Sequence, residues 1–312
     1  MLRRERLLRT LTFCLRPAFA LRVVGRFQAV IGFDRSMALA SSAFTALVPL
    51  TLLAGAVLGD MVQVDAAQWI IQRYDLAGAG AEAVTYLFSP AQKADAGTGV
   101  LGVLFLTISV LSFARAAQRL VEQTWGLSPL SVRNSRNGLY WIFSLGGYAL
   151  VGGWISAVLG GWAGGLPATV CGAAVSAVFL VWSGWILSAK RIPGVELIPF
   201  GISGAVLVGV YSWGATLYLP RLFNSYADRY GVVGAVFAML SALFAAMLVI
   251  VASAVLGREV SEELARIRQG LRPSEHEVRR QWEDVREHAR ARWRTVREDV
   301  VRRRGKRGAT GR

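Results

Sequence analysis

The chain has 312 residues, of which 54% are hydrophobic and 18% are charged, and its formal net charge is +15. Long uncharged apolar runs, with the charges gathered near the two ends, exclude an ordinary soluble domain. The composition therefore predicts an all-α, polytopic membrane protein. We expect a basic N-terminal segment at 1–35, a membrane domain at 36–260 and a basic cytoplasmic tail at 261–312.

The N-terminal segment, 1–35, carries eight arginines. Between positions 19 and 31 apolar residues recur every three or four positions, with Arg22 and Arg26 between them. This pattern predicts an amphipathic helix that lies in the headgroup layer of the membrane. The alternative is a basic leader surrounded by water.

The first membrane span is predicted at Ser36–Gly59, which contains no charged residue. Its polar and helix-breaking positions include Ser41, Ser42, Thr45 and Pro49. A proline removes one backbone donor, and in lipid that loss must be compensated by neighbouring helices, hydroxyl groups or water. We therefore expect these four residues to face a polar or closely packed bundle interior, where they are candidate contacts of a substrate.

Five further spans are predicted, which gives six transmembrane helices in all. They lie at about 98–113, 139–159, 168–188, 200–219 and 232–256. The second span is expected to continue as a helix towards position 125, and the long connection before it is expected to hold short interfacial helices.

The connections between the spans differ in their content of Lys and Arg. Four such residues lie in 115–137 and two in 189–197, against two in 60–97, none in 160–167 and two in 220–230. The termini are richer still, with eight in the first 35 residues and 17 from position 258 onward. The positive-inside rule therefore favours six spans with both termini in the cytoplasm.

The tail combines 17 basic with 10 acidic residues from Arg258 onward. Ser274, with Glu277 three residues later, predicts the start of a charged helix with a narrow apolar stripe. This helix could bind the membrane surface, pair as a coiled coil, dock on the bundle or stay solvated. The mixed charge and the absence of a groove-reading motif argue against nucleic acid as a partner.

The predicted spans contain no constellation of catalytic residues. They lack paired carboxylates and Ser/His/Asp or Cys/His sets, and His276 and His288 both lie in the tail. We therefore expect no enzymatic activity, no metal site and no cofactor.

Charges near membrane depth are the better indication of function, because they are costly there. On one side the candidates are Arg115, Arg119, Glu122 and Glu259. The two arginines could hold anionic lipid headgroups, or they could simply pair with the two carboxylates. On the other side we expect a comparable cluster before the last span, at Arg221, Tyr226 and Tyr230.

Four segments in this order resemble the YihY/virulence factor BrkB family of bacterial inner-membrane proteins. They are ALASSAFTALVPLTLL (38–53), GVLGVLFLTISVLSFARAAQRLVEQTW (99–125), NSYADRYGVVGAVFAML (224–240) and LGREVSEEL (256–264). One departure is Arg258, which stands where the family usually has a small residue. The resemblance implies six helices and a location in the cytoplasmic (inner) membrane.

The family has been linked to serum resistance and to envelope lipid transport, and it has also carried a ribonuclease BN label. The resemblance thus implies a protein that transports or flips an amphiphilic envelope substrate such as a lipid, with anionic headgroups as partners. The alternative is a non-transporting scaffold whose basic tail recruits a partner or anionic lipid. The residues argue against a ribonuclease, and they leave the substrate, a coupling ion and a homo-oligomer open.

Overall fold

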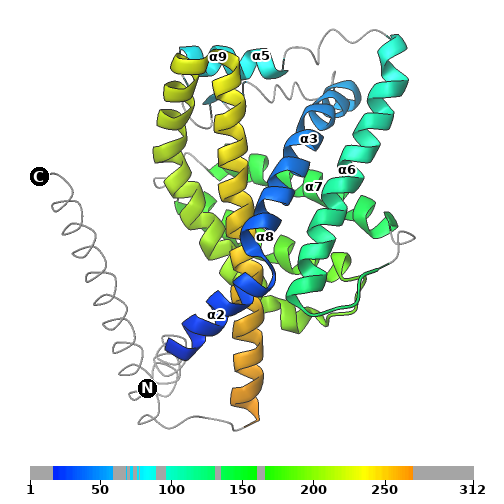
Figure 1. The fold of residues 1–312 in the computed structure, drawn as a ribbon, viewed down its shortest axis with the longest axis vertical. Helices are drawn as coiled ribbons and strands as arrows, with labels where there is room; N and C mark the ends of the chain where they lie inside the picture. Colours follow the sequence, from blue (N-terminus) through cyan, green and yellow to red (C-terminus); the bar gives the residue numbers. More distant parts are fainter. Residues whose placement is uncertain are drawn as a thin grey trace, which may run out of the picture. The chain divides into compact units, whose positions relative to one another are not determined.

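The chain is described here by a computed structural model that covers residues 17–58, 68, 71–72, 76, 78–88, 96–130, 135–159 and 166–269. For 17–18, 48–58, 79, 83, 86–88, 96–103, 106, 135 and 166–167 it describes the backbone only. The elements of these ranges are helices: α2 Pro17–Ala29, α3 Gly32–Leu58, α5 Ala79–Phe88, α6 Ala96–Thr124, α7 Ser135–Leu159, α8 Leu166–Leu187 and α9 Gly194–Arg268 (Figure 1). The all-α prediction is confirmed for the part of the chain that is described.

The chain divides into two compact units. The larger unit is Arg26–Ser261, and the smaller one combines Met1–Gly25 with Glu262–Arg312. Within the smaller unit, Arg22 Nη2 lies 2.7 Å from Glu263 Oε2. The predicted division at positions 35 and 260 stays a prediction.

Three helices of the described ranges are long and apolar enough to cross a membrane: Arg136–Leu159, Ala168–Leu187 and Gly194–Arg268. The third has 75 residues. At about 1.5 Å per residue it is far longer than the ~30 Å hydrocarbon layer requires. The existence of apolar, membrane-compatible helices is confirmed, whereas six separate spans stay a prediction.

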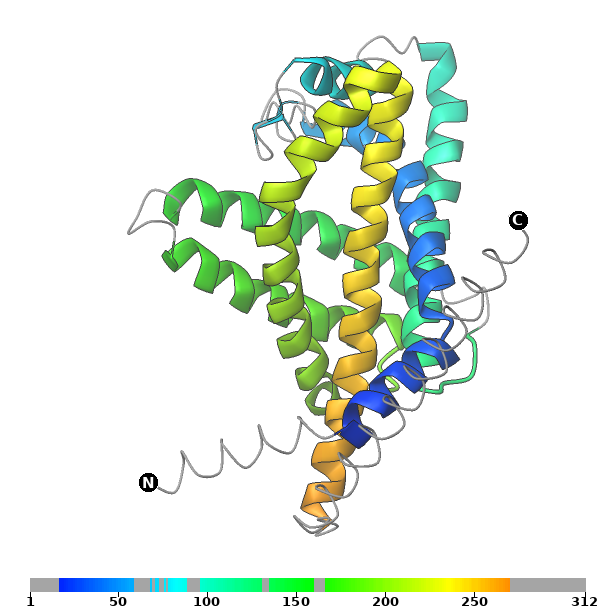
Figure 2. The same cartoon turned by 60° about the vertical axis from the view of Figure 1, so that its left-hand side comes forward.

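Helix α9 is a hairpin of two helical halves. Its backbone breaks at Gly231, where φ is 59° and ψ is −138°. The half before Gly231 and the half after it run side by side in opposite directions (Figure 2). Two hydrogen bonds join them: Tyr211 Oη donates to Ala242 O at 2.9 Å, and Ser203 Oγ donates to Ser253 O at 3.2 Å. Glycine alone adopts this backbone conformation without strain, so the chain reverses at this residue.

The structure has helix in parts of the chain that were predicted as connections on either side of the fifth span. Residues 220–230 are helical up to Tyr230, and the helix already begins at Gly194 instead of 200. Polar turn-forming residues predicted a loop at 220–230, but Leu222 and Phe223 are buried there. Burial of these side chains stabilises the helix beyond what its local propensity provides.

The other predicted elements are found close to their expected positions. Helix α3 covers the first predicted span up to Leu58, and α6 continues without a break from the second span to Thr124, as expected. Helix α2 overlaps the predicted N-terminal helix, and α5 is one of the short helices expected before α6. The predicted tail helix that starts at Ser274 lies outside the described residues.

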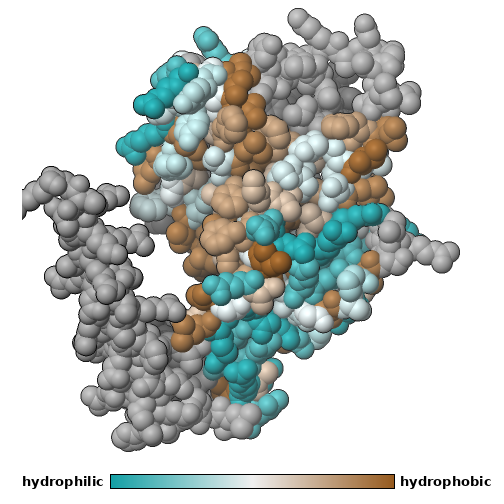
Figure 3. Space-filling model, viewed as in Figure 1, coloured by the Kyte–Doolittle hydropathy of each residue, from teal (hydrophilic) through white to brown (hydrophobic). Residues whose placement is uncertain are grey.

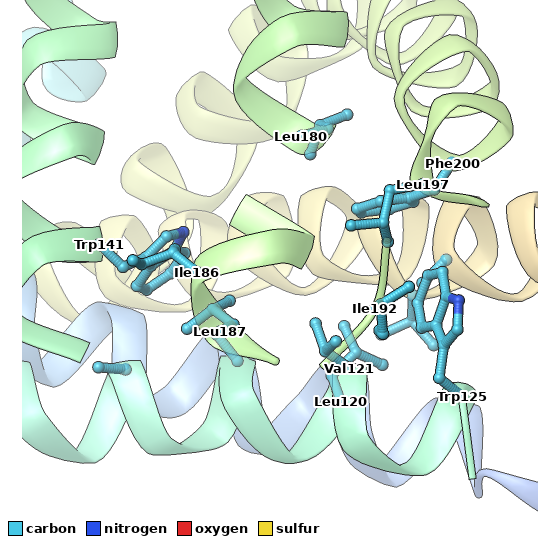
Figure 4. Packing of buried hydrophobic residues seen from close by; sticks show 14 of the residues in the cluster. Leu120, Val121, Trp125, Trp141, Leu180, Ile186, Leu187, Ile192, Leu197 and Phe200 are labelled. Atoms are coloured by element: carbon cyan, nitrogen blue, oxygen red, sulfur yellow. The ribbon is translucent and has the colours of Figure 1, made fainter. Parts of the chain in front are cut away.

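The two larger buried apolar clusters of the described residues lie in the larger unit. In the first, α6, α8 and the start of α9 meet, and the rings of Trp125 and Phe200 pack edge to face at 5.7 Å beside Ile192 (Figure 4). At the same level, a Cβ on Gly257 would overlap the Phe200 backbone, so glycine permits the close approach of the two halves of α9.

The second cluster lies at the other end of the hairpin, near the break, and we call it the apolar tip. It consists of Leu76, Val84, Ala215, Leu219, Leu222, Phe223, Ala238 and Met239. Helix α5 contributes Val84 and packs so closely that a Cβ on Gly80 would lie 2.5 Å from Asn224 Oδ1. The segments predicted at 60–97 and 220–230, both expected outside, therefore meet at the apolar tip.

Candidate functional site: the charged base of the helices

The opposite end of the α9 hairpin carries two ion pairs, Glu122–Arg191 and Arg26–Glu259. We call these four residues the charged base. They bring together α2, α6, the connection between α8 and α9, and the end of α9 within the larger unit. All four segments were predicted on the cytoplasmic side.

Glu122 is the first centre of the charged base, and it is only 3% exposed. Its Oε1 accepts three hydrogen bonds: from Gln118 Nε2 at 2.9 Å, from Leu130 N at 3.0 Å and from Arg191 Nη2 at 3.2 Å. A buried carboxylate needs such donors, because burial removes its hydration. Glu122 thereby fixes α6 to the connection that follows it and to the one before α9.

Arg191 uses its other donors on the same two connections. Its Nε donates to Ser188 O at 2.9 Å and its Nη1 donates to Ser128 O at 2.8 Å. A planar guanidinium group with several fixed N–H donors suits a position that joins three chain segments. Arg191 therefore crosslinks both connections through backbone carbonyl groups as well as through Glu122.

Glu259 is the second centre, and it is also 3% exposed. Arg26 Nε donates to its Oε1 at 2.5 Å, and Arg26 Nη1 donates to Thr124 O at 3.4 Å. One arginine of α2 thus joins the end of α6 to the end of α9. A nearby pair, Arg258 and Glu196, is looser at 3.7 Å and has its carboxylate half exposed.

The sequence-based pairing of Arg115 and Arg119 with these carboxylates is wrong. Both arginines are exposed on α6, and neither has an ion pair with Glu122 or Glu259. The carboxylates are paired with other arginines, 69 and 233 residues away in the chain. The sequence did hold one indication of the true partners. A buried carboxylate requires a cation, and Arg191 and Arg26 both lie in segments predicted on the same cytoplasmic side as the two carboxylates.

The three hydroxyl residues of α3 that were predicted to face the bundle interior are not all closely packed. Ser41 and Thr45 are exposed and Ser42 is partly buried. Each hydroxyl donates to a backbone carbonyl of its own helix: Ser41 to Ala38, Ser42 to Leu39 and Thr45 to Ser41. Close packing is thus wrong for Ser41 and Thr45, while exposure to a polar groove stays a prediction.

Pro49 lies inside α3, and the helical backbone continues through it to Leu58. Its side chain is outside the described part, so its expected direction stays a prediction.

The predicted cluster near the apolar tip is only partly assembled. The rings of Tyr226 and Tyr230 lie 6.5 Å apart and both are exposed. Arg221 is exposed as well, and its Nη1 donates to Leu217 O at 3.3 Å, within its own helix. The sequence did not indicate Asn224, whose Oδ1 is buried beside α5 with no hydrogen-bond partner among the described residues.

No three His, Cys, Asp or Glu side chains come close enough to share a metal ion in the ranges that the structure describes. The two carboxylates of the charged base form ion pairs with arginines. This arrangement fixes helices and connections relative to one another.

Comparison with known proteins gives one match. The family model described as Virulence factor BrkB matches residues 23–277. The match begins within α2 and includes α9, the charged base and the apolar tip. No curated protein matches the chain, and no solved structure matches it.

Proposed function

Because the chain belongs to the virulence factor BrkB family, we propose that it transports or flips an amphiphilic envelope substrate, such as a lipid. Its family and its apolar helices make it a membrane protein. The proposal places it in the bacterial cytoplasmic membrane as a multi-pass protein with both termini in the cytoplasm. It assigns no enzymatic activity and no cofactor, and it names anionic lipid headgroups as partners.

The observation that carries the proposal is the charged base. Two carboxylates, each 3% exposed, lie in ion pairs that join separate segments. A protein that only anchors itself gains little from such pairs, since apolar side chains of similar volume often serve stability equally well or better. Ion pairs between segments do offer discrete contacts that break and re-form when helices move.

The apolar tip supports the same proposal. At the apolar tip the two halves of α9 pack through buried apolar side chains, and the turn depends on a single glycine, Gly231. A hinge needs a few residues that tolerate a change of backbone angles, often at the end of a helix. The charged base would then open while the apolar tip holds the hairpin together.

The test is a flipping assay with the full chain in liposomes that carry a fluorescent phospholipid. Folded protein should accelerate the movement of the label between leaflets relative to protein-free liposomes. Glu259→Gln should lower that rate severalfold, because a neutral amide at this buried position no longer forms an ion pair with Arg26 of α2. Glu196→Gln is the matched control, since that carboxylate is half exposed and its pair is long.

Folded, reconstituted protein that moves no lipid would count against transport. The scaffold alternative then has its own test, deletion of residues 270–312, which hold most of the basic tail. A scaffold should lose partner recruitment on this deletion, whereas a transporter should keep most of its flipping activity.

A further inference from the structure

The exposed face of α6 changes from apolar to basic along the helix. The exposed residues that follow one another on it are Leu104, Ile108, Ser112, Arg115 and Arg119. Their spacings of three and four residues keep them on one face, because an α-helix turns about once every 3.6 residues. In Figure 3, hydrophobic surface over the middle of α6 gives way to hydrophilic surface towards its C-terminal end.

The two arginines of this face are not used by the fold. Neither side chain has an ion pair or a hydrogen bond to any residue in the described part of the chain. Glu122, the acidic residue of α6, lies on its buried side and is held by Arg191. Like charges four residues apart on a helix repel each other, so an anion between them stabilises this face.

We propose that this face binds one anionic phospholipid. Its phosphate lies between Arg115 and Arg119, and its acyl chains run along Leu104 and Ile108. Two guanidinium groups bind phosphate oxygens through charge-assisted hydrogen bonds. From Leu104 to Arg119 the helix rises about 22 Å, close to one leaflet of a bilayer that is about 40–45 Å thick with its headgroups.

A lipid fits this face better than a free phosphate ion. Leu104 is 57% exposed and Ile108 is 60% exposed, and a free anion would leave both uncovered. The arginines also lie on the predicted cytoplasmic side, where anionic lipids give the membrane surface a negative potential. Binding does not require that the lipid be moved, so this inference and the transport proposal can fail separately.

The experiment is native mass spectrometry of the full chain in detergent, titrated with phosphatidylglycerol or with phosphatidylcholine of the same acyl chains. Wild-type protein should bind phosphatidylglycerol more tightly. The double variant R115Q/R119Q should bind it about tenfold more weakly, the loss expected for one charge-assisted contact. Its fold should be retained, because both side chains are exposed and neither forms a hydrogen bond or an ion pair with a described residue.

Two further variants define the site. R229Q/R268Q removes two exposed arginines elsewhere on α9 and should keep wild-type binding. L104S/I108S keeps both charges and should weaken binding of phosphatidylglycerol, because the acyl chains lose their apolar surface.

Three results would overturn the proposal. The first is equal affinity for the two lipids, and the second is an equal loss in R115Q/R119Q and R229Q/R268Q. The third is complete displacement of the lipid by millimolar inorganic phosphate with no effect of L104S/I108S, which would show a site for a free anion.

Discussion

The charged base and the apolar tip lie at opposite ends of the α9 hairpin, and different forces hold them. At the charged base, buried Glu122 and Glu259 each bind one arginine from another segment. At the apolar tip, eight buried apolar residues pack around the turn at Gly231. Apolar side chains can exchange neighbours gradually, whereas an ion pair is either formed or broken. Under the transport proposal, we therefore expect a conformational change to begin at the charged base.

The largest effect is expected from Glu259→Ala at the charged base. Removing one partner of a fully buried ion pair typically costs about 3–5 kcal/mol, and the 26% exposure of the Arg26 side chain places this variant towards the lower end of that range. Thermal unfolding in detergent should therefore show a large drop in the apparent Tm. Glu196→Ala is the control and should cost at most about 1 kcal/mol, since exposed pairs contribute little. Equal Tm values for the two variants would contradict a buried pair at Glu259.

A smaller effect is expected from Gly231→Ala at the apolar tip. An L-residue with φ of 59° and ψ of −138° is strained by about 1–3 kcal/mol, and the apparent Tm should fall accordingly. Gly209→Ala is the matched control inside α9, where an added Cβ meets nothing within 4 Å. It should stabilise the helix by up to about 1 kcal/mol. If both substitutions raised the Tm, the result would contradict the positive φ angle at Gly231.

The smallest effect is expected midway along the hairpin, from Tyr211→Phe. The Tyr211 hydroxyl donates to Ala242 O at 2.9 Å across the two halves, and such a bond contributes about 0.5–1.5 kcal/mol net. Tyr218→Phe is the control because Tyr218 is 61% exposed. The same small loss in both variants would show that the halves are not joined at this level.

Much of the fold could be predicted from local sequence. Uncharged runs located α3, α7 and α8 to within a few residues, because hydropathy and helix formation depend on neighbouring residues. The turn was predicted at 220–230, before its actual position at Gly231, because the polar residues of 220–230 are typical of a loop. Only packing against α5 and the other half of α9 keeps them helical up to Gly231.

The sequence analysis predicted the two carboxylates of the charged base but missed the two arginines that pair with them. Glu122 and Glu259 were expected to matter because they end apolar runs. Arg191 was not indicated, since it is one of two basic residues in a short connection, and Arg26 was assigned to an amphipathic helix. Arg119, the cation nearest to Glu122 in sequence, lies with Arg115 on an exposed face of α6.

The sequence by itself determined the membrane class, the all-helical content and the family, because these depend on composition, local periodicity and motif order. Only the tertiary structure decided which arginine pairs with which carboxylate and where the last helix reverses. Those choices depend on segments up to 233 residues apart in the chain, and a local pattern holds no information on which distant side chains will meet.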